Sequence, residues 1–145
     1  MWNYLLFSPL KRQITCFRQE RMESHITPSA EAWLDLQCRK TGSSLQERKR
    51  LAMGILSKRN RLPVLTSLQP FTLYFPWKHP EAELSCWINR ARVNRVDNRF
   101  SKALITFSDG EQLEVPDARR LCSTLSSLDV LALVLQPASL GFSGL

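Results

Sequence analysis

The chain has 145 residues, a formal net charge of +7 and 43% hydrophobic residues. This length fits one domain around one core, and the apolar content is enough to offset the entropy of ordering the chain, which excludes wholesale disorder. The apolar runs are too short for a membrane-spanning helix, and the run at the start lacks the preceding positive charge of a secretory leader. We therefore expect a cytoplasmic protein without a membrane partner.

The first third of the sequence predicts an arm, a strand and a helix. Residues 1–24 mix aromatic and basic side chains without a clear period, which predicts a loosely ordered N-terminal arm. Apolar residues alternate over Ala32–Cys38, which predicts a short strand. Ser44 and Glu47 have the spacing of a capping box and good helix formers follow them, so we predict a helix over Leu45–Lys58.

From residue 62 onward the sequence is typical of short strands, with many aromatic and β-branched residues. The predicted strands are Pro63–Leu65, Phe71–Phe75, Cys86–Val96 and Ala103–Phe107. Asp109 and Gly110 lie between two apolar runs and supply the positive φ of a tight turn, which predicts a β-hairpin over Leu104–Val115.

The last third predicts a second helix. Asp117 is placed to cap a helix that begins at Ala118, and leucines recur behind it at spacings of three and four. The run Val130–Leu135 is apolar on all sides, so it either continues this helix, forms a buried strand or meets another subunit. We expect a flexible tail over residues 137–145. Together the elements predict an α+β fold, a small mainly antiparallel β-sheet or barrel-like domain with a mid-chain helix and a C-terminal helix.

Catalytic and metal-binding signatures are absent from the sequence. The two histidines, His25 and His79, have no carboxylate placed to orient them, and the four widely spaced cysteines form no zinc-site pattern. No phosphate-binding loop, nucleotide fingerprint or nucleophile elbow occurs. We expect reduced and mostly buried thiols, no metal, no cofactor and no enzymatic activity. A Cys–His pair that the fold brings together is the catalytic alternative.

The net charge is concentrated in one segment. Residues 39–61 contain eight basic side chains and one acidic side chain, while the rest of the chain sums to zero. One interpretation of this segment is a binding site for a polyanionic partner, which would relieve the self-repulsion of the cluster. The alternative is an ordinary solvent-exposed helix face. The candidate DNA contacts in this segment are Arg39, Lys40, Arg48, Lys49, Arg50, Lys58, Arg59 and Arg61.

A second, smaller basic group adds Arg90, Arg92 and Arg95 to the candidates. If Cys86–Val96 is one strand, its period of two places Arg90, Arg92 and Asn94 on the same face. A row of guanidinium groups can follow a phosphate backbone or enter a narrow minor groove. The alternative is the plain solvent face of a half-buried sheet.

Several short motifs occur in a distinctive order. They are Cys38-Arg39, Gly42-Ser43-Ser44, Arg48-Lys49, Arg61-Leu62-Pro63-Val64, Phe71-Thr72-Leu73-Tyr74-Phe75-Pro76, Cys86-Trp87-Ile88 and Thr106-Phe107-Ser108-Asp109-Gly110. In this order they resemble the ComK competence transcription factors over about residues 38–116. The resemblance implies an activator that binds AT-rich promoter boxes of double-stranded DNA largely through the minor groove, assembles as a homo-oligomer and switches on DNA-uptake genes.

The resemblance also implies a single ComK-like DNA-binding domain over residues 25–136 and a proteolytic adaptor as a further partner. After the hairpin the chain departs from the family pattern, because it lacks the Tyr- and Arg-containing helical region and the charged tail. A second hypothesis follows from this departure. In it the chain is a protein-interaction module of the same fold that has lost promoter activation and binds a partner through Leu125–Leu135.

Overall fold

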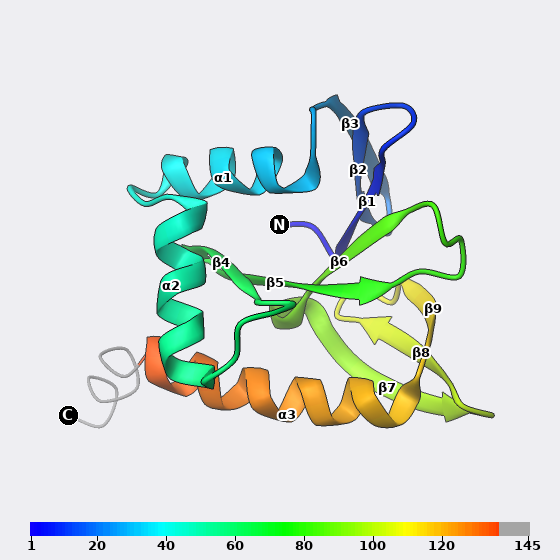
Figure 1. Ribbon diagram of the computed structural model, residues 1–145. Coiled ribbons are helices and arrows are strands. Elements are labelled where there is room, and N and C mark those ends of the chain that lie inside the picture. The colour runs from blue at the N-terminus through cyan, green and yellow to red at the C-terminus, as the bar shows by residue number, and fades with distance from the viewer. Residues whose placement is uncertain (137–145) are drawn as a thin grey trace.

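The computed structural model describes residues 1–136, which form two antiparallel sheets and three α-helices (Figure 1). This α+β arrangement of mainly antiparallel strands, with a mid-chain and a C-terminal helix, confirms the predicted fold class. The tail predicted over residues 137–145 lies outside the described part of the chain. No helix within residues 1–136 is long and apolar enough to cross a membrane.

The N-terminal residues are part of the fold. They form the strands β1 (Tyr4–Ser8), β2 (Gln13–Arg18) and β3 (Arg21–Ile26). Leu5 of β1 pairs with Cys16 on one side and, on the other, with Trp87 of β6 (Ser85–Asn89). The loosely ordered arm predicted over residues 1–24 was therefore wrong. A strand covered on both faces lacks the alternation of apolar and polar residues that marks a strand in a sequence.

The residues predicted as a strand over Ala32–Cys38 belong to the helix α1 (Ala30–Lys40). Ser29 caps this helix, and its Oγ accepts a hydrogen bond from the backbone N–H of Ala32 at 3.0 Å. The strand prediction was wrong because the apparent alternation included Leu36, which is exposed. The buried side chains of α1 have helical spacing instead, and they are Ala30, Trp33, Leu34 and Cys38.

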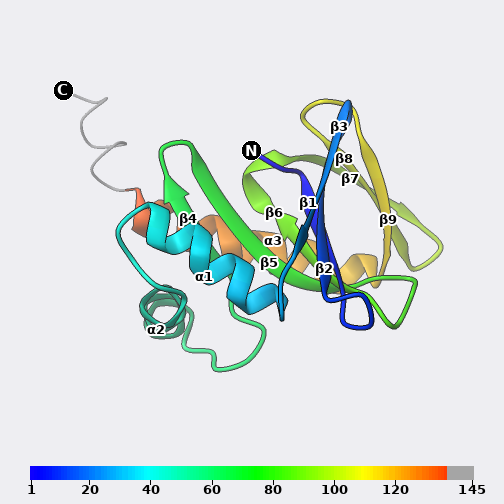
Figure 2. The same cartoon turned by 90° about the horizontal axis from the view of Figure 1, so that it is seen from above.

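The helix α2 (Leu45–Leu56) begins where the sequence predicted. The Oγ of Ser44 accepts a hydrogen bond from the Glu47 N–H at 3.2 Å, and the same hydroxyl donates to the Glu47 carboxylate at 3.2 Å. The helix ends before the predicted Lys58 because Ser57 adopts a left-handed conformation with a φ of 52°. Figure 2 shows α2 nearly end-on where α1 lies across the view, so the two helices cross.

The chain then moves from the larger sheet to the smaller one. The predicted strands near Pro63 and Phe71 are confirmed as β4 (Val64–Leu68) and β5 (Phe71–Lys78). The predicted strand Cys86–Val96 is broken after β6 by a 3-10 turn, η1 (Arg90–Arg92). The smaller sheet follows, with the strands β7 (Val93–Arg99), β8 (Lys102–Phe107) and β9 (Gln112–Pro116).

A buried asparagine causes this break. Asn89 is completely buried, and its Oδ1 accepts hydrogen bonds from the backbone N–H groups of Ala91 at 3.1 Å and Leu73 at 3.3 Å. A short side chain that bonds the backbone two residues on mimics a turn and competes with the sheet ladder. The strand order is β3-β2-β1-β6-β5-β4 in the larger sheet and β7-β8-β9 in the smaller one.

The predicted hairpin around Asp109 and Gly110 is confirmed by the antiparallel pairing of β8 with β9. Gly110 has a φ of 91°, and its N–H donates to the carbonyl of Phe107 at 2.9 Å. The connection is a three-residue loop that ends on a left-handed glycine. The same loop is held from outside the hairpin, because Asn3 bonds the carboxylate of Asp109.

The predicted C-terminal helix is α3 (Ala118–Leu135), which is continuous and excludes the strand alternative for Val130–Leu135. Its buried stripe has the predicted spacing and consists of Ala118, Leu121, Leu125, Leu128 and Leu131. The capping role predicted for Asp117 was wrong, because this residue has a φ of 68° and its side chain makes no capping hydrogen bond.

Two apolar clusters lie on opposite faces of the larger sheet. Successive residues of β5 point to opposite faces, so Tyr74 packs with Trp33 of α1 while Phe75 packs with the buried stripe of α3 and with the smaller sheet. In Figure 1 α1 lies above the sheet and α3 below it, and α2 joins the two at one end. The loop after α2, residues 57–63, thereby lies beside α3.

Candidate nucleic-acid interface

The structure places the basic segment 39–61 at one end of the fold, on the end of α1, on α2 and on the following loop. Arg39 forms an ion pair with Asp35, with Nε and Oδ2 at 2.7 Å. The other seven cations of the segment form no ion pair with any residue in the range 1–136. This end of the molecule therefore keeps its surplus charge in the folded state.

The ion pair at Arg39 has a structural role. Asp35 also accepts a hydrogen bond from the Leu45 N–H at 2.9 Å, which ties α1 to the start of α2. The Leu45 N–H and the Arg39 guanidinium lower the pKa of Asp35. Arg39 is thus neutralised by its own helix, which makes it the weakest candidate of the segment for a phosphate contact.

Arg48 differs from its neighbours on α2. Its side chain is half-buried, and its Nε is buried without a hydrogen-bond partner in the part of the chain that the structure describes. It lines a hollow with Thr41, Ser67 and Leu68 and so points toward the body of the protein. Arg50 is exposed. The basic side chains of α2 therefore do not all face solvent.

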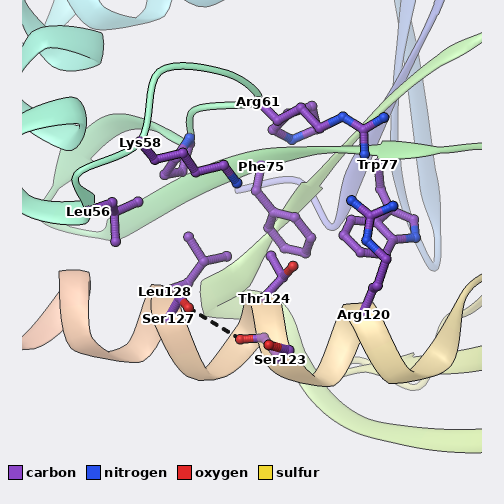
Figure 3. Close-up of a pocket in the computed structure, with 12 residues that line it drawn as sticks. Leu56, Lys58, Arg61, Phe75, Trp77, Arg120, Ser123, Thr124, Ser127 and Leu128 are labelled. Atoms are coloured by element: carbon purple, nitrogen blue, oxygen red, sulfur yellow. Dashed lines mark hydrogen bonds between the residues drawn. The ribbon is translucent and has the colours of Figure 1, made fainter.

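Lys58 and Arg61 meet at a cleft between the loop 57–63, β5 and α3 (Figure 3). Arg120 of α3 lines the same cleft, which has a volume of about 260 Å³ and, among residues 1–136, no acidic residue in its lining. We call it the basic cleft. Its floor is apolar, with Phe75 and Leu128, and hydroxyl groups line its α3 side, from Ser123, Thr124 and Ser127.

The aromatic wall of the basic cleft positions Arg120. The Trp77 indole N–H donates to the carbonyl of Pro116 at 3.0 Å, which fixes the ring, and the Arg120 guanidinium lies 6.0 Å from the ring centroid. Arg120 also lies 3.6 Å from the carboxylate of Asp117. A guanidinium beside a lysine and a second arginine presents several N–H donors to a phosphate.

Sequence reasoning missed two cations of this region. Arg120 follows Arg119 in a stretch where the negative charge of Asp117 offsets part of the positive charge, so the sequence shows little net charge there. Only the fold brings Arg120 close to Arg61. Lys78 stands alone in the sequence but shares a neighbouring hollow with Arg61. Arg61 therefore lines both the basic cleft and the hollow that contains Lys78, which Glu31 also lines.

The second predicted group is neutralised. Arg90 forms a two-armed pair with Asp129 of α3, at 2.9–3.1 Å, and Arg92 lies 3.4 Å from Asp109. Arg95 pairs with a neighbour on its own strand, Asp97, at 3.1 Å. Because η1 interrupts the strand, the shared strand face predicted for Arg90, Arg92 and Asn94 was wrong. Arg90 and Arg92 instead join separate parts of the fold.

A further basic group lies in the segment predicted as an arm. Arg18 and Arg21, at the tip of the β2–β3 hairpin, each have their guanidinium carbon 5.7 Å from the centroid of the Trp2 ring. Both line a polar hollow with Arg92. Glu23 pairs with Arg21 and Asp109 with Arg92, so this group carries less net charge than the basic cleft.

The residues considered for catalysis are not assembled into a site. Within the described range, the one carboxylate that pairs with His25 is that of the half-buried Glu23, at 3.7 Å, and no three His, Cys, Asp or Glu side chains could hold a metal ion together. The predicted thiols are confirmed as free and mostly buried, with Cys122 the exposed one. Burial raises the pKa of Cys16 and of Cys86 to about 12, which keeps both thiols protonated.

Comparison with protein families gives a match to one family model, described as ComK protein, over residues 11–121. Because the match covers most of the chain, the protein belongs to the ComK family, a family of competence transcription factors. The match starts well before the first predicted motif at Cys38, which agrees with β2, β3 and α1 being integral to the fold. No curated protein and no solved structure matches the chain.

Proposed function

We propose that this protein is a DNA-binding transcriptional activator of DNA-uptake genes that recognises AT-rich promoter duplexes. The observation that carries the proposal is the uncompensated charge of residues 40–61, together with the basic cleft into which Lys58, Arg61 and Arg120 point. Lysine and arginine side chains of this kind neutralise phosphates and release counterions. Family membership supports a role in transcription.

The candidate DNA contacts fall into two groups, according to whether an ion pair neutralises them. Six cations of the segment contact phosphates or reach into the minor groove in this proposal, and they are Lys40, Lys49, Arg50, Lys58, Arg59 and Arg61. Lys78 and Arg120 extend this set, although Arg120 lies 3.6 Å from the exposed carboxylate of Asp117. Arg48 points toward the body of the protein and is a weaker candidate. Arg39, Arg90, Arg92 and Arg95 contact DNA only if it displaces the carboxylates that they face. Sequence preference for AT-rich DNA arises in this proposal from groove width and deformability, because arginine favours a narrow minor groove.

Salt titration with an AT-rich duplex tests the proposal. A contact set of about six phosphates gives a slope of about −5 in a plot of log affinity against log salt. The double variant Lys58→Gln/Arg61→Gln should make the slope less steep by about 2 units and weaken binding to all duplexes alike. The matched control Lys11→Gln/Arg12→Gln removes the same charge from the exposed β1–β2 connection and should leave the slope nearly unchanged. A flat salt response of the unmodified protein refutes the proposal.

A second candidate function rests on the exposed apolar end of α3. Val130, Leu133 and Val134 are each about half exposed or more, whereas Leu128 and Leu131 of the same helix are buried. This surface suits a protein partner, and a complex through it would survive high salt because apolar burial is not screened. Self-association and binding of a proteolytic adaptor stay predictions. Sedimentation at high salt of Leu133→Glu beside the unmodified chain tests whether this surface assembles.

A further inference from the structure

The turn between β7 and β8 carries an unusual residue. Arg99 pairs with Lys102, which leaves Phe100 and Ser101 as a two-residue loop. The Phe100 side chain is completely exposed. An aromatic ring that contacts nothing in its own fold contributes no burial to stability, although water contact with it is unfavourable.

The backbone at this turn is strained. Phe100 has a φ of 51° and Ser101 a φ of 72°, the positive values that a tight hairpin of this type needs at both central positions. Asparagine and glycine normally occupy these positions, and a bulky residue there is a conformational outlier. Neither packing nor backbone preference explains why a phenylalanine stands at the tip. Outliers of this kind cluster at binding sites.

The tip is held firmly in place. The carbonyl of Ser101 accepts a hydrogen bond from the backbone N–H of Ala118 at 2.9 Å, which ties the turn to the start of α3. Behind the turn, β8 is paired on both sides, with β7 and with β9. In Figure 1 this hairpin projects from the body of the protein. Phe100 is therefore presented on a rigid support.

The surroundings of the tip favour a polyanion. Arg99 beside Phe100 is exposed and has no ion pair with any residue of the described part, and Lys102 lies 3.7 Å from Glu114. Ala118, which holds the turn, is two residues before Arg120 of the basic cleft. The first turn of α3 thus connects the tip to Arg120 in the wall of the basic cleft.

We infer that Phe100 is an apolar wedge that inserts between two base pairs from the minor groove, unstacks them and kinks the duplex, while Arg99 contacts a flanking phosphate. The inference rests on the proposed DNA binding and names its mode. Apolar side chains on firm supports act in this way in minor-groove proteins. Pyrimidine–purine steps such as TA unstack most easily, so an AT-rich duplex is a fitting target.

The experiment uses an AT-rich duplex with a fluorophore at each end and 2-aminopurine at a central TA step. Binding of the unmodified protein should change the end-to-end energy transfer and increase the 2-aminopurine signal. Phe100→Ala should bind about tenfold more weakly, since the buried ring is lost, and should abolish both signals. Leu10→Ala is the control, because Leu10 is 94% exposed at another turn, and it should behave as the unmodified protein.

A second variant distinguishes loss of the aromatic ring from damage to the turn. Phe100→Asn/Ser101→Gly keeps the turn with residues suited to it and removes the ring. It should retain salt-dependent duplex binding through the basic cleft without kinking. Full kinking by either Phe100 variant, or binding of the unmodified protein without kinking, refutes the wedge alone. Absence of duplex binding by the unmodified protein refutes the wedge and the proposed function together.

Discussion

Replacement of Asn3 by alanine removes the centre of a polar network that joins the N-terminus to the β8–β9 hairpin. Asn3 is completely buried, and its Nδ2 donates to both carboxylate oxygens of Asp109, at 3.0 and 2.9 Å, and to Glu111 at 2.9 Å. Its Oδ1 accepts from the Nε of Arg92 at 3.0 Å. Asn3→Ala removes the hydrogen-bond partner that these bonds give to Asp109, Glu111 and Arg92.

The expected cost follows from the groups left unpaired. Hydrogen bonds to charged partners contribute about 1.5–3 kcal/mol each, and water replaces part of them because the side chain of Asp109 is 22% exposed. We expect Asn3→Ala to lower the free energy of unfolding by about 2–4 kcal/mol. With a urea m value of about 2 kcal/mol/M, the midpoint should fall by about 1–2 M.

Urea titration followed by circular dichroism measures this change. Asn98→Ala is the control, because Asn98 is exposed and its side chain makes no hydrogen bond within residues 1–136. A midpoint of Asn3→Ala that lies within experimental error of the Asn98→Ala midpoint contradicts the reasoning. It would mean that the N-terminus does not depend on this network.

The same variant has a defined pH dependence. Burial by itself raises the pKa of Asp109, but the Glu111 N–H, the Asn3 amide, the Gln19 N–H and the charge of Arg92 together lower it below its usual value. A carboxyl group with a lowered folded pKa contributes stability above its unfolded pKa and loses it as the pH falls through the folded pKa. The stability difference between the unmodified protein and Asn3→Ala should therefore shrink below about pH 4.

Three further outcomes are expected. Arg90→Gln should lower the free energy of unfolding by about 1 kcal/mol, because its partner Asp129 is 57% exposed and water screens the pair, and a thermal melt beside Arg99→Gln measures this. A maleimide reagent should label the native chain once, at Cys122, and four times in urea; mass spectrometry that finds more than one label in the native state contradicts the burial of the other thiols. Phe100→Asn/Ser101→Gly should stabilise the free protein by about 1–2 kcal/mol, because it relieves two left-handed non-glycine residues, and a urea titration that shows no gain argues against strain at the turn.

Local signals in the sequence predicted several elements correctly, because the residues that specify them are neighbours in the chain. Ser44 and Glu47 specify the start of α2, and Gly110 specifies the hairpin of β8 and β9. The spacing of Leu121, Leu125 and Leu128 specifies the buried face of α3. The concentration of charge in residues 39–61 is likewise a property of the sequence.

Predictions that depended on neighbours in space were wrong. Tyr4 and Leu5 are both buried because β1 has another layer on each face, so no alternation revealed the strand. Alternation over Ala32–Cys38 suggested a strand, whereas packing of Trp33 and Leu34 on the sheet makes a helix. Asn89 breaks the strand at Arg90 by accepting a hydrogen bond from the Ala91 N–H, and a second bond from the N–H of Leu73, which is distant in the sequence, holds its side chain in place.

The sequence by itself determined the ComK family, the α+β class and the amount and location of the surplus charge. Only the tertiary structure decided which cations are available, because ion pairing depends on distance in space. It pairs Arg90 with Asp129 and Arg92 with Asp109. It leaves Lys58 and Arg61 beside Arg120 in a cleft that no acidic residue of the described chain lines. It also places an exposed Phe100 on a strained turn, a conformation that a hydrogen bond from the backbone N–H of Ala118 holds in place.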